Sequence, residues 1–118
     1  MLRAFLSLIL ILIAPAGFAA IESSTTLAPT DVISFRSHSV RHTFPLVHNM
    51  HMLWANGLAA GSTSVYLYAS DDPFLYATTL KAVTSREKML VIYDTDPATR
   101  GPWGDASSSM LTSITILK

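Results

Sequence analysis

The chain of 118 residues contains no cysteine. It therefore forms no disulfide, offers no site for a lipid-modified cysteine, and has no thiol for nucleophilic catalysis. Small exported domains often use disulfides to offset a small hydrophobic core. A cysteine-free chain must instead depend on packing, on oligomerisation or on a partner.

Charge is also scarce, because charged residues make up only 14% of the chain and eight basic residues balance eight acidic ones. Bulk electrostatics therefore gives no reason to expect binding to nucleic acid or to an anionic membrane. After the first 20 residues, no apolar run is long enough to span a bilayer. There is no G-x-S-x-G motif of the kind that presents a catalytic serine, and we expect no enzyme.

The first 20 residues have the three parts of a secretory signal peptide. Arg3 supplies a positive charge, Leu6 to Ile13 forms a short apolar core, and small residues lead up to Ala20. A membrane anchor is the alternative, but a spanning helix needs about 20 apolar residues. We therefore expect cleavage after Ala19 or Ala20 and a periplasmic or secreted bacterial protein. Removal of the first 20 of 118 residues leaves 98, which suits one domain.

The mature chain is predicted to begin with a flexible leader at residues 21–30, which are rich in Ser and Thr. A single domain is then expected over residues 31–118. Alternating or β-branched patterns predict strands at Asp31 to Val40, Ser64 to Ala69, Met89 to Tyr93 and Met110 to Leu117. In the first of these, Ile33 and Phe35 are expected to share one apolar face.

Pro45 to Ala60 fits either a helix or two strands joined by a turn, and the Asn56-Gly57 pair favours the turn. A helix is predicted from Pro73 to about Ser85, with Asp72 as its N-cap, because Asp caps free amides and Pro suits the first helical position. Its predicted buried stripe consists of Tyr76, Ala77, Leu80 and Val83. The expected fold is mainly β with one α-helix, either a small OB-like five-stranded Greek-key barrel or another α+β fold.

The second half of the chain carries a family resemblance over Val65 to Lys118. A VYLY strand is followed by the helix-to-strand segment DDPFLYATTLKAVTSREKMLVIYD, by a Trp-Gly loop and by a short last strand. This order is similar to small exported bacterial proteins with an OB-like fold, including the B subunits of subtilase-cytotoxin and typhoid-toxin type. The resemblance implies an OB-like fold and a binding role. The chain lacks the cysteine pair that many of these proteins carry.

Two groups of residues are candidates for binding. Trp54, Arg100 and Trp103 are predicted ligand-binding residues, because Trp and Arg are enriched in binding hot spots. For Trp103, the alternative is a ring folded back onto the end of the barrel. His48, Met50, His51 and Met52 offer the imidazole and thioether groups that bind copper, although Met50 and Met52 are equally suited to a core. Asp71, Asp72 and Asp94 are explained by capping and turns.

The leading hypothesis is thus an exported, non-enzymatic binding module without cofactor, whose ligand is a protein or a glycan. The second hypothesis is a periplasmic copper-binding protein that uses residues 48–52. The third is a structural subunit that needs a homo-oligomer for its stability.

Overall fold

The computed structural model describes residues 21–39, 41, 49–59, 61–101 and 106–118. The predicted signal peptide, His48 and Trp103 lie outside the described residues. The elements, in chain order, are β1 (Glu22–Leu27), η1 (Pro29–Asp31), β2 (Val32–Ser37), β3 (Met50–Ala55), β4 (Ser64–Tyr68), α2 (Pro73–Thr84), β5 (Lys88–Asp94), η2 (Pro97–Thr99) and β6 (Ser108–Leu117). This confirms a mainly β protein with one α-helix in the described part of the chain.

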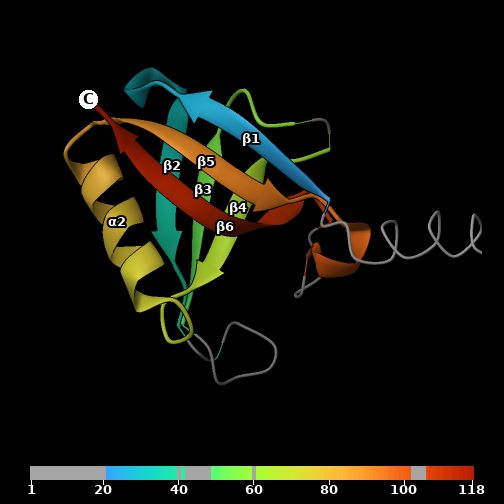
Figure 1. Cartoon of the computed structure of the whole chain (residues 1–118). Coiled ribbons are helices and arrows are strands. Elements are labelled where there is room, and N and C mark those ends of the chain that lie inside the picture. Colours follow the sequence, from blue (N-terminus) through green and yellow to red (C-terminus); the bar gives the residue numbers. More distant parts are fainter. Residues whose placement is uncertain (1–20, 40, 42–48, 60, 102–105) are drawn as a thin grey trace, which may run out of the picture.

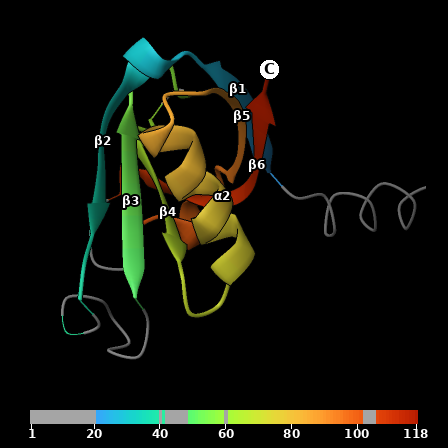
Figure 2. The same ribbon diagram turned by 90° about the vertical axis from the view of Figure 1, so that its left-hand side faces the viewer.

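The strands form one sheet in the order β1-β5-β6-β4-β3-β2. Neighbours pair antiparallel except β4 and β6, which pair in parallel. The sheet is strongly bent around α2, as Figure 1 shows. Figure 2 shows β2, β3 and β4 as one wall and β1, β5 and β6 as the other, with the helix between them. This arrangement is compatible with a small α+β or OB-like fold.

The prediction of a flexible leader at residues 21–30 is wrong, and the sheet has six strands rather than five. Residues Glu22 to Leu27 form β1, which pairs with β5 from Glu22 opposite Asp94 to Leu27 opposite Met89. The side chain of Leu27 is fully buried in the core. A polar edge strand has the composition of a linker, and only its pairing with a distant strand identifies it.

The prediction that Ile33 and Phe35 share one apolar face is also wrong. The register of β2 against β3 shifts between Val32 and Ser34, where a β-bulge interrupts the alternation. Val32 and Phe35 consequently pack against the core, whereas the side chain of Ile33 is 62% exposed. A bulge inserts one extra residue and reverses the faces beyond it.

Helix α2 begins at Pro73, as predicted, and Asp72 holds the N-cap position without a hydrogen bond from its side chain. The predicted buried stripe is only partly correct. Leu80 is 38% exposed, whereas Thr79 and Ala82 are the buried residues of the helix. Thr79 can face the core because its hydroxyl donates to the Leu75 carbonyl oxygen at 2.8 Å, which leaves its methyl group to pack.

The predicted turn at Asn56-Gly57 follows β3 directly. On the inner face of the sheet, the core fills the space beneath α2 and includes Leu53, Val65, Val91 and Tyr93. On the outer face of β3 and β4, a second cluster consists of Met50, Met52 and Tyr66, with Trp54, Tyr68 and Met110 packed against it. β3 therefore contributes to two separate apolar clusters by strict alternation of its side chains.

Candidate binding groove between β2 and α2

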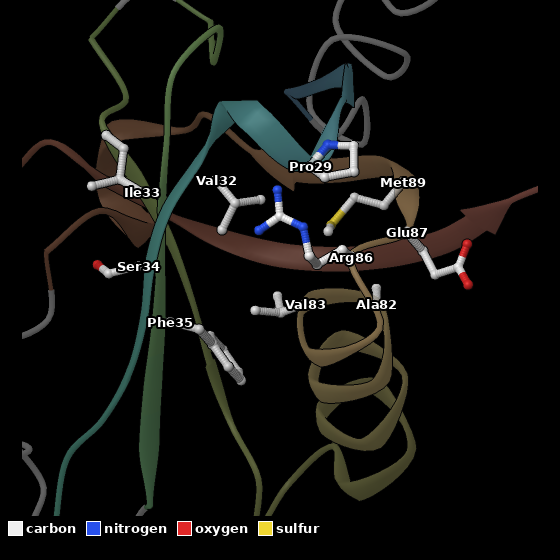
Figure 3. Close-up of a pocket in the computed structure, with 10 residues that line it drawn as sticks. All are labelled: Pro29, Val32, Ile33, Ser34, Phe35, Ala82, Val83, Arg86, Glu87 and Met89. Carbon is white, nitrogen blue, oxygen red and sulfur yellow. The ribbon is translucent and has the colours of Figure 1, made fainter.

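A pocket of about 210 Å³ opens between β2 and the C-terminal turn of α2. Figure 3 shows the side chains that line it. Val32 and Phe35 come from β2, Val83 comes from α2, and Met89 is the second residue of β5. The lining also includes two charged side chains, those of Arg86 and Glu87, which follow the end of the helix. The pocket therefore combines apolar walls with a charged rim, the composition expected of a ligand site.

The pocket lies beside an open edge of the sheet. β2 pairs with β3 on one side and is the last strand in the sheet order of the described residues. His38 directs its backbone N–H toward β3, because it donates to the Met50 carbonyl oxygen at 2.8 Å. Backbone groups alternate along a strand, so Ser37 directs its N–H away from the sheet. An incoming strand could use such groups as partners.

The end of α2 is closed by a Schellman motif. Glu87 donates its backbone N–H to the Ala82 carbonyl oxygen at 2.9 Å, and Arg86 donates to that of Val83 at 3.2 Å. In this motif the first residue after the helix cap has a left-handed backbone, and glycine is the usual residue at that position. Here it is Arg86, with φ of 52°. A non-glycine residue in this conformation costs roughly 1–2 kcal/mol.

The side chain of Arg86 points into the groove. Figure 3 shows its guanidinium group between Val32 and Met89, while the carboxylate of Glu87 points away from it. Within the described residues, the structure shows no ion pair between Arg86 and a carboxylate. The groove thus holds a positive charge beside apolar side chains, and an anion could approach it.

Phe35, which lines the groove, also belongs to an aromatic cluster. The ring of Phe35 lies 6.0 Å from that of His51 and 6.3 Å from that of Tyr76, between centroids. Ser37 Oγ lies 2.8 Å from His51 Nδ1. Burial lowers the pKa of His51, because the charged imidazolium loses hydration. The ring is therefore neutral at pH 7 and packs as an aromatic residue.

The Ser37–His51 contact does not form a catalytic triad in the described part of the chain. No carboxylate is seen to hydrogen-bond to His51 there, and orientation of the histidine by a third group is what activates such a serine. Other serine hydroxyls pair with one another, as Ser62 does with Ser109 at 2.6 Å and Ser64 with Ser108 at 2.9 Å. The Ser64–Ser108 contact joins the parallel strands β4 and β6, and the Ser62–Ser109 contact joins the turn before β4 to β6.

The structure places two of the three predicted ligand-binding residues away from this groove. Trp54 is half-buried against the outer cluster. Arg100 follows η2 as its C-cap. Its guanidinium packs on the turn before β4, since a Cβ atom added to Gly61 would lie 2.8 Å from Arg100 Nη1. Arg100 Nε is buried without a hydrogen-bond partner among the described residues. Trp103 lies outside the described residues.

The loop that carries Arg100 is fastened to the outer cluster by a hydrogen bond. The Tyr66 hydroxyl donates to the Thr99 carbonyl oxygen at 2.5 Å. Burial, with smaller contributions from Tyr68 and Asp94, raises the pKa of Tyr66 to about 12. The hydroxyl therefore keeps its proton at neutral pH and remains a donor.

The copper hypothesis required His51 to converge with Met50 and Met52. The structure separates them, because Met50 and Met52 belong to the outer cluster, whereas His51 contacts Tyr76 of α2 on the inner face. His48 lies outside the described residues. In the part of the chain that the structure describes, no three His, Asp or Glu side chains gather into a metal site.

Sequence reasoning named Phe35 and Val83 only as apolar residues of a strand and a helix, and it did not single out Arg86. One signal could have found it: the helix ends within Thr84-Ser85-Arg86-Glu87, which contains neither the Gly nor the Asn that normally ends a helix. Among the described residues, no helix has the length and apolar character needed to cross a membrane.

Comparison of the chain with models of protein families, with curated proteins and with solved structures found no match. The resemblance to toxin B subunits therefore stays a prediction.

Proposed function

We propose that the mature, exported chain is a non-enzymatic binding module that holds an extended segment of a partner protein along the edge of β2. The observation that carries this proposal is the position of the pocket, which is lined by Val32 and Phe35 of the edge strand itself. A peptide that pairs with an edge strand obtains its affinity from main-chain hydrogen bonds and its specificity from side-chain pockets.

The geometry supports both parts of that recognition. The N–H of Ser37 and other outward-facing backbone groups of β2 would form the ladder with the peptide. Side chains of an added strand alternate between the two faces, so every second side chain faces the same way as Phe35. One apolar side chain of the peptide would enter the pocket between Val32, Val83 and Met89.

The other edge of the sheet is β1, which is polar. Four of the six residues of β1 are Ser or Thr, and they offer little apolar surface. A glycan is also a weaker candidate than a peptide at β2, because it does not repeat amide and carbonyl groups at the spacing of a strand. The edge and the pocket together therefore favour a protein ligand.

The test is selection of peptides by residues 21–118 from a displayed library of random 12-residue sequences. We expect enrichment of β-branched residues with an apolar residue at alternate positions. Ser37→Pro removes the outward N–H and should abolish binding of the selected peptides. Ser37→Ala, which loses only the hydroxyl, should retain it.

A second control addresses the other edge. The Thr95 N–H donates to the Ile21 carbonyl oxygen, so by alternation Ser24 also directs its N–H away from the sheet. Ser24→Pro should leave peptide binding intact. If Ser24→Pro abolishes binding while Ser37→Pro does not, or if no peptide is enriched, the groove is not the site. Circular dichroism checks that each variant is folded.

The same variants separate a partner protein from a second copy of the chain. Sedimentation velocity of residues 21–118 without peptide should show a monomer. A dimer that is lost in Ser37→Pro would instead assign the edge to self-association. Export is tested independently by mass spectrometry of the protein from a bacterial periplasm, which should begin at Ala20 or Ile21.

A further inference from the structure

The conformation of Arg86 calls for an explanation that the fold does not supply. A left-handed residue at this end of a helix is most favourable as glycine, yet the chain has arginine there with φ of 52°. Both backbone bonds of the motif, to Ala82 and to Val83, would be made equally well by glycine. Strained residues of this kind are characteristic of ligand sites.

The side chain offers the explanation, because it is exposed and directed into the groove. Its guanidinium lies between Val32 and Met89 in Figure 3. Such a group is planar and binds a carboxylate through two parallel hydrogen bonds. Because the side chain of Arg86 is exposed, added salt screens this attraction.

Two acidic residues lie next to lining residues in the chain: Glu87 follows Arg86, and Asp31 precedes Val32. The carboxylate of Glu87 points away from the guanidinium in Figure 3. Asp31 accepts the backbone N–H of Ala28 at 2.8 Å. Among the residues that the structure describes, no carboxylate therefore pairs with Arg86, and its positive charge can meet an external anion.

We infer that Arg86 makes the groove selective for a ligand that presents a carboxylate next to an apolar side chain. This inference rests on the proposed peptide groove and names the chemistry that the groove selects. In a peptide, the carboxylate belongs to an Asp or Glu side chain or to the C-terminus. The apolar group fills the pocket beside Val83 while the carboxylate pairs with Arg86.

The probes are hexanoate and hexanamide, which share one apolar tail and differ in charge. Each is titrated onto nitrogen-15-labelled residues 21–118 and followed by NMR at the backbone amides of Val32, Phe35 and Arg86. We expect hexanoate to bind about tenfold more tightly than hexanamide, as a charge-assisted pair in place of a neutral one implies. The preference should fall with added salt.

Three substitutions of Arg86 separate the effects of charge, backbone strain and the planar guanidinium. Arg86→Gly removes the charge and the strain, so the preference for hexanoate should vanish while the melting temperature rises by roughly 4 °C or more. Arg86→Gln removes the charge and keeps the strained backbone, so the preference should vanish without that rise. Arg86→Lys, with a charge but no planar fork, should retain only part of the preference.

The outcomes distinguish this inference from the proposed function. Equal binding of the two probes in the pocket, or hexanoate shifts confined to other residues, would overturn the role of Arg86 and leave the peptide groove standing. A lower melting temperature for Arg86→Gly would show that arginine stabilises the helix end, and would also overturn it. Carboxylate preference without any enriched peptide would support Arg86 and reject strand addition. To locate the carboxylate, the selected peptides are compared with free and amidated C-termini.

Discussion

The ring of His51 lies 4.2 Å from the ring of Tyr76, measured between centroids, with the two planes 34° apart. This contact joins β3 to α2 on the inner face of the sheet. Burial holds the pKa of His51 below its ordinary value of 6.5. The folded protein therefore holds a neutral histidine against the ring of Phe35, which lines the groove.

We expect the free energy of unfolding to fall as the pH is lowered through 6.5. The unfolded chain takes up a proton on His51 near pH 6.5, and the folded chain does so only at lower pH, so acid favours the unfolded state. The loss is complete below the folded-state pKa. Urea unfolding at steps between pH 7.5 and 5 measures it. His51→Gln should flatten the dependence, and an unchanged slope would assign it to other groups.

The pairing of β1 predicts that Leu27 is essential for stability. Its side chain is fully buried, so Leu27→Ala should destabilise the protein by about 2–5 kcal/mol through lost burial and a cavity. Thr26→Ala, at an exposed position on the same strand, should change stability by no more than about 0.5 kcal/mol. If both substitutions have equally small effects on urea unfolding, residues 21–30 do not contribute to the folded core, as the prediction of a flexible leader holds.

The buried Tyr93 hydroxyl links three segments. It accepts the backbone N–H of Ala59 at 2.7 Å and lies 2.8 Å from Thr25 Oγ1. Tyr93→Phe should cost about 1–3 kcal/mol, because the Ala59 amide loses its partner. Thr25→Val leaves that amide bonded and should cost less. If both variants unfold at the same urea concentration, the Ala59 bond contributes nothing measurable.

Two glycines with positive φ form a matched pair for testing the position of Arg100. Gly57 has φ of 88° and nothing within 4 Å of an added Cβ, whereas Gly61 has φ of 85° and would place its Cβ 2.8 Å from Arg100 Nη1. Gly57→Ala should cost roughly 1–2 kcal/mol of backbone strain. Gly61→Ala should cost more, by the displacement of the guanidinium.

Substitution of the arginine should remove that difference. In an Arg100→Ala background, Gly61→Ala should cost no more than Gly57→Ala, and the double-mutant cycle should give about 0.5 kcal/mol or more of coupling. Zero coupling in thermal or urea unfolding would mean that Arg100 is free of the turn, and would return it to the candidates for ligand contact.

Local sequence patterns correctly predicted the elements that depend on interactions between neighbouring residues. The apolar run of residues 89–93 became the centre of β5, Pro73 began the helix, and Asn56-Gly57 made the turn after β3. In each case the residue's own backbone preference or the length of an apolar run decides the structure. The count of strands was wrong because β1 is polar and its partner, β5, lies far along the chain.

The candidate site depended on long-range contacts. Nothing in the local pattern placed the bulge at Ile33, which turns Val32 toward the pocket. The pattern likewise did not reveal that Arg86 becomes left-handed and lies against β2. The pattern of residues 45–60 fitted either a helix or two strands, and the assignment of Met50 and His51 to opposite faces of β3 required the position of α2.

The sequence by itself determined that this chain is cysteine-free, nearly neutral and mainly β with one helix, because composition, turn residues and apolar period act within a few residues. Only the tertiary structure decided that residues 22–27 form one edge strand of the sheet and that β2, beside a pocket, forms the other edge in the described part of the chain. Pairing between distant strands and the packing of α2 place Phe35 and Arg86 at the same pocket. The backbone preferences of neighbouring residues do not determine such long-range contacts.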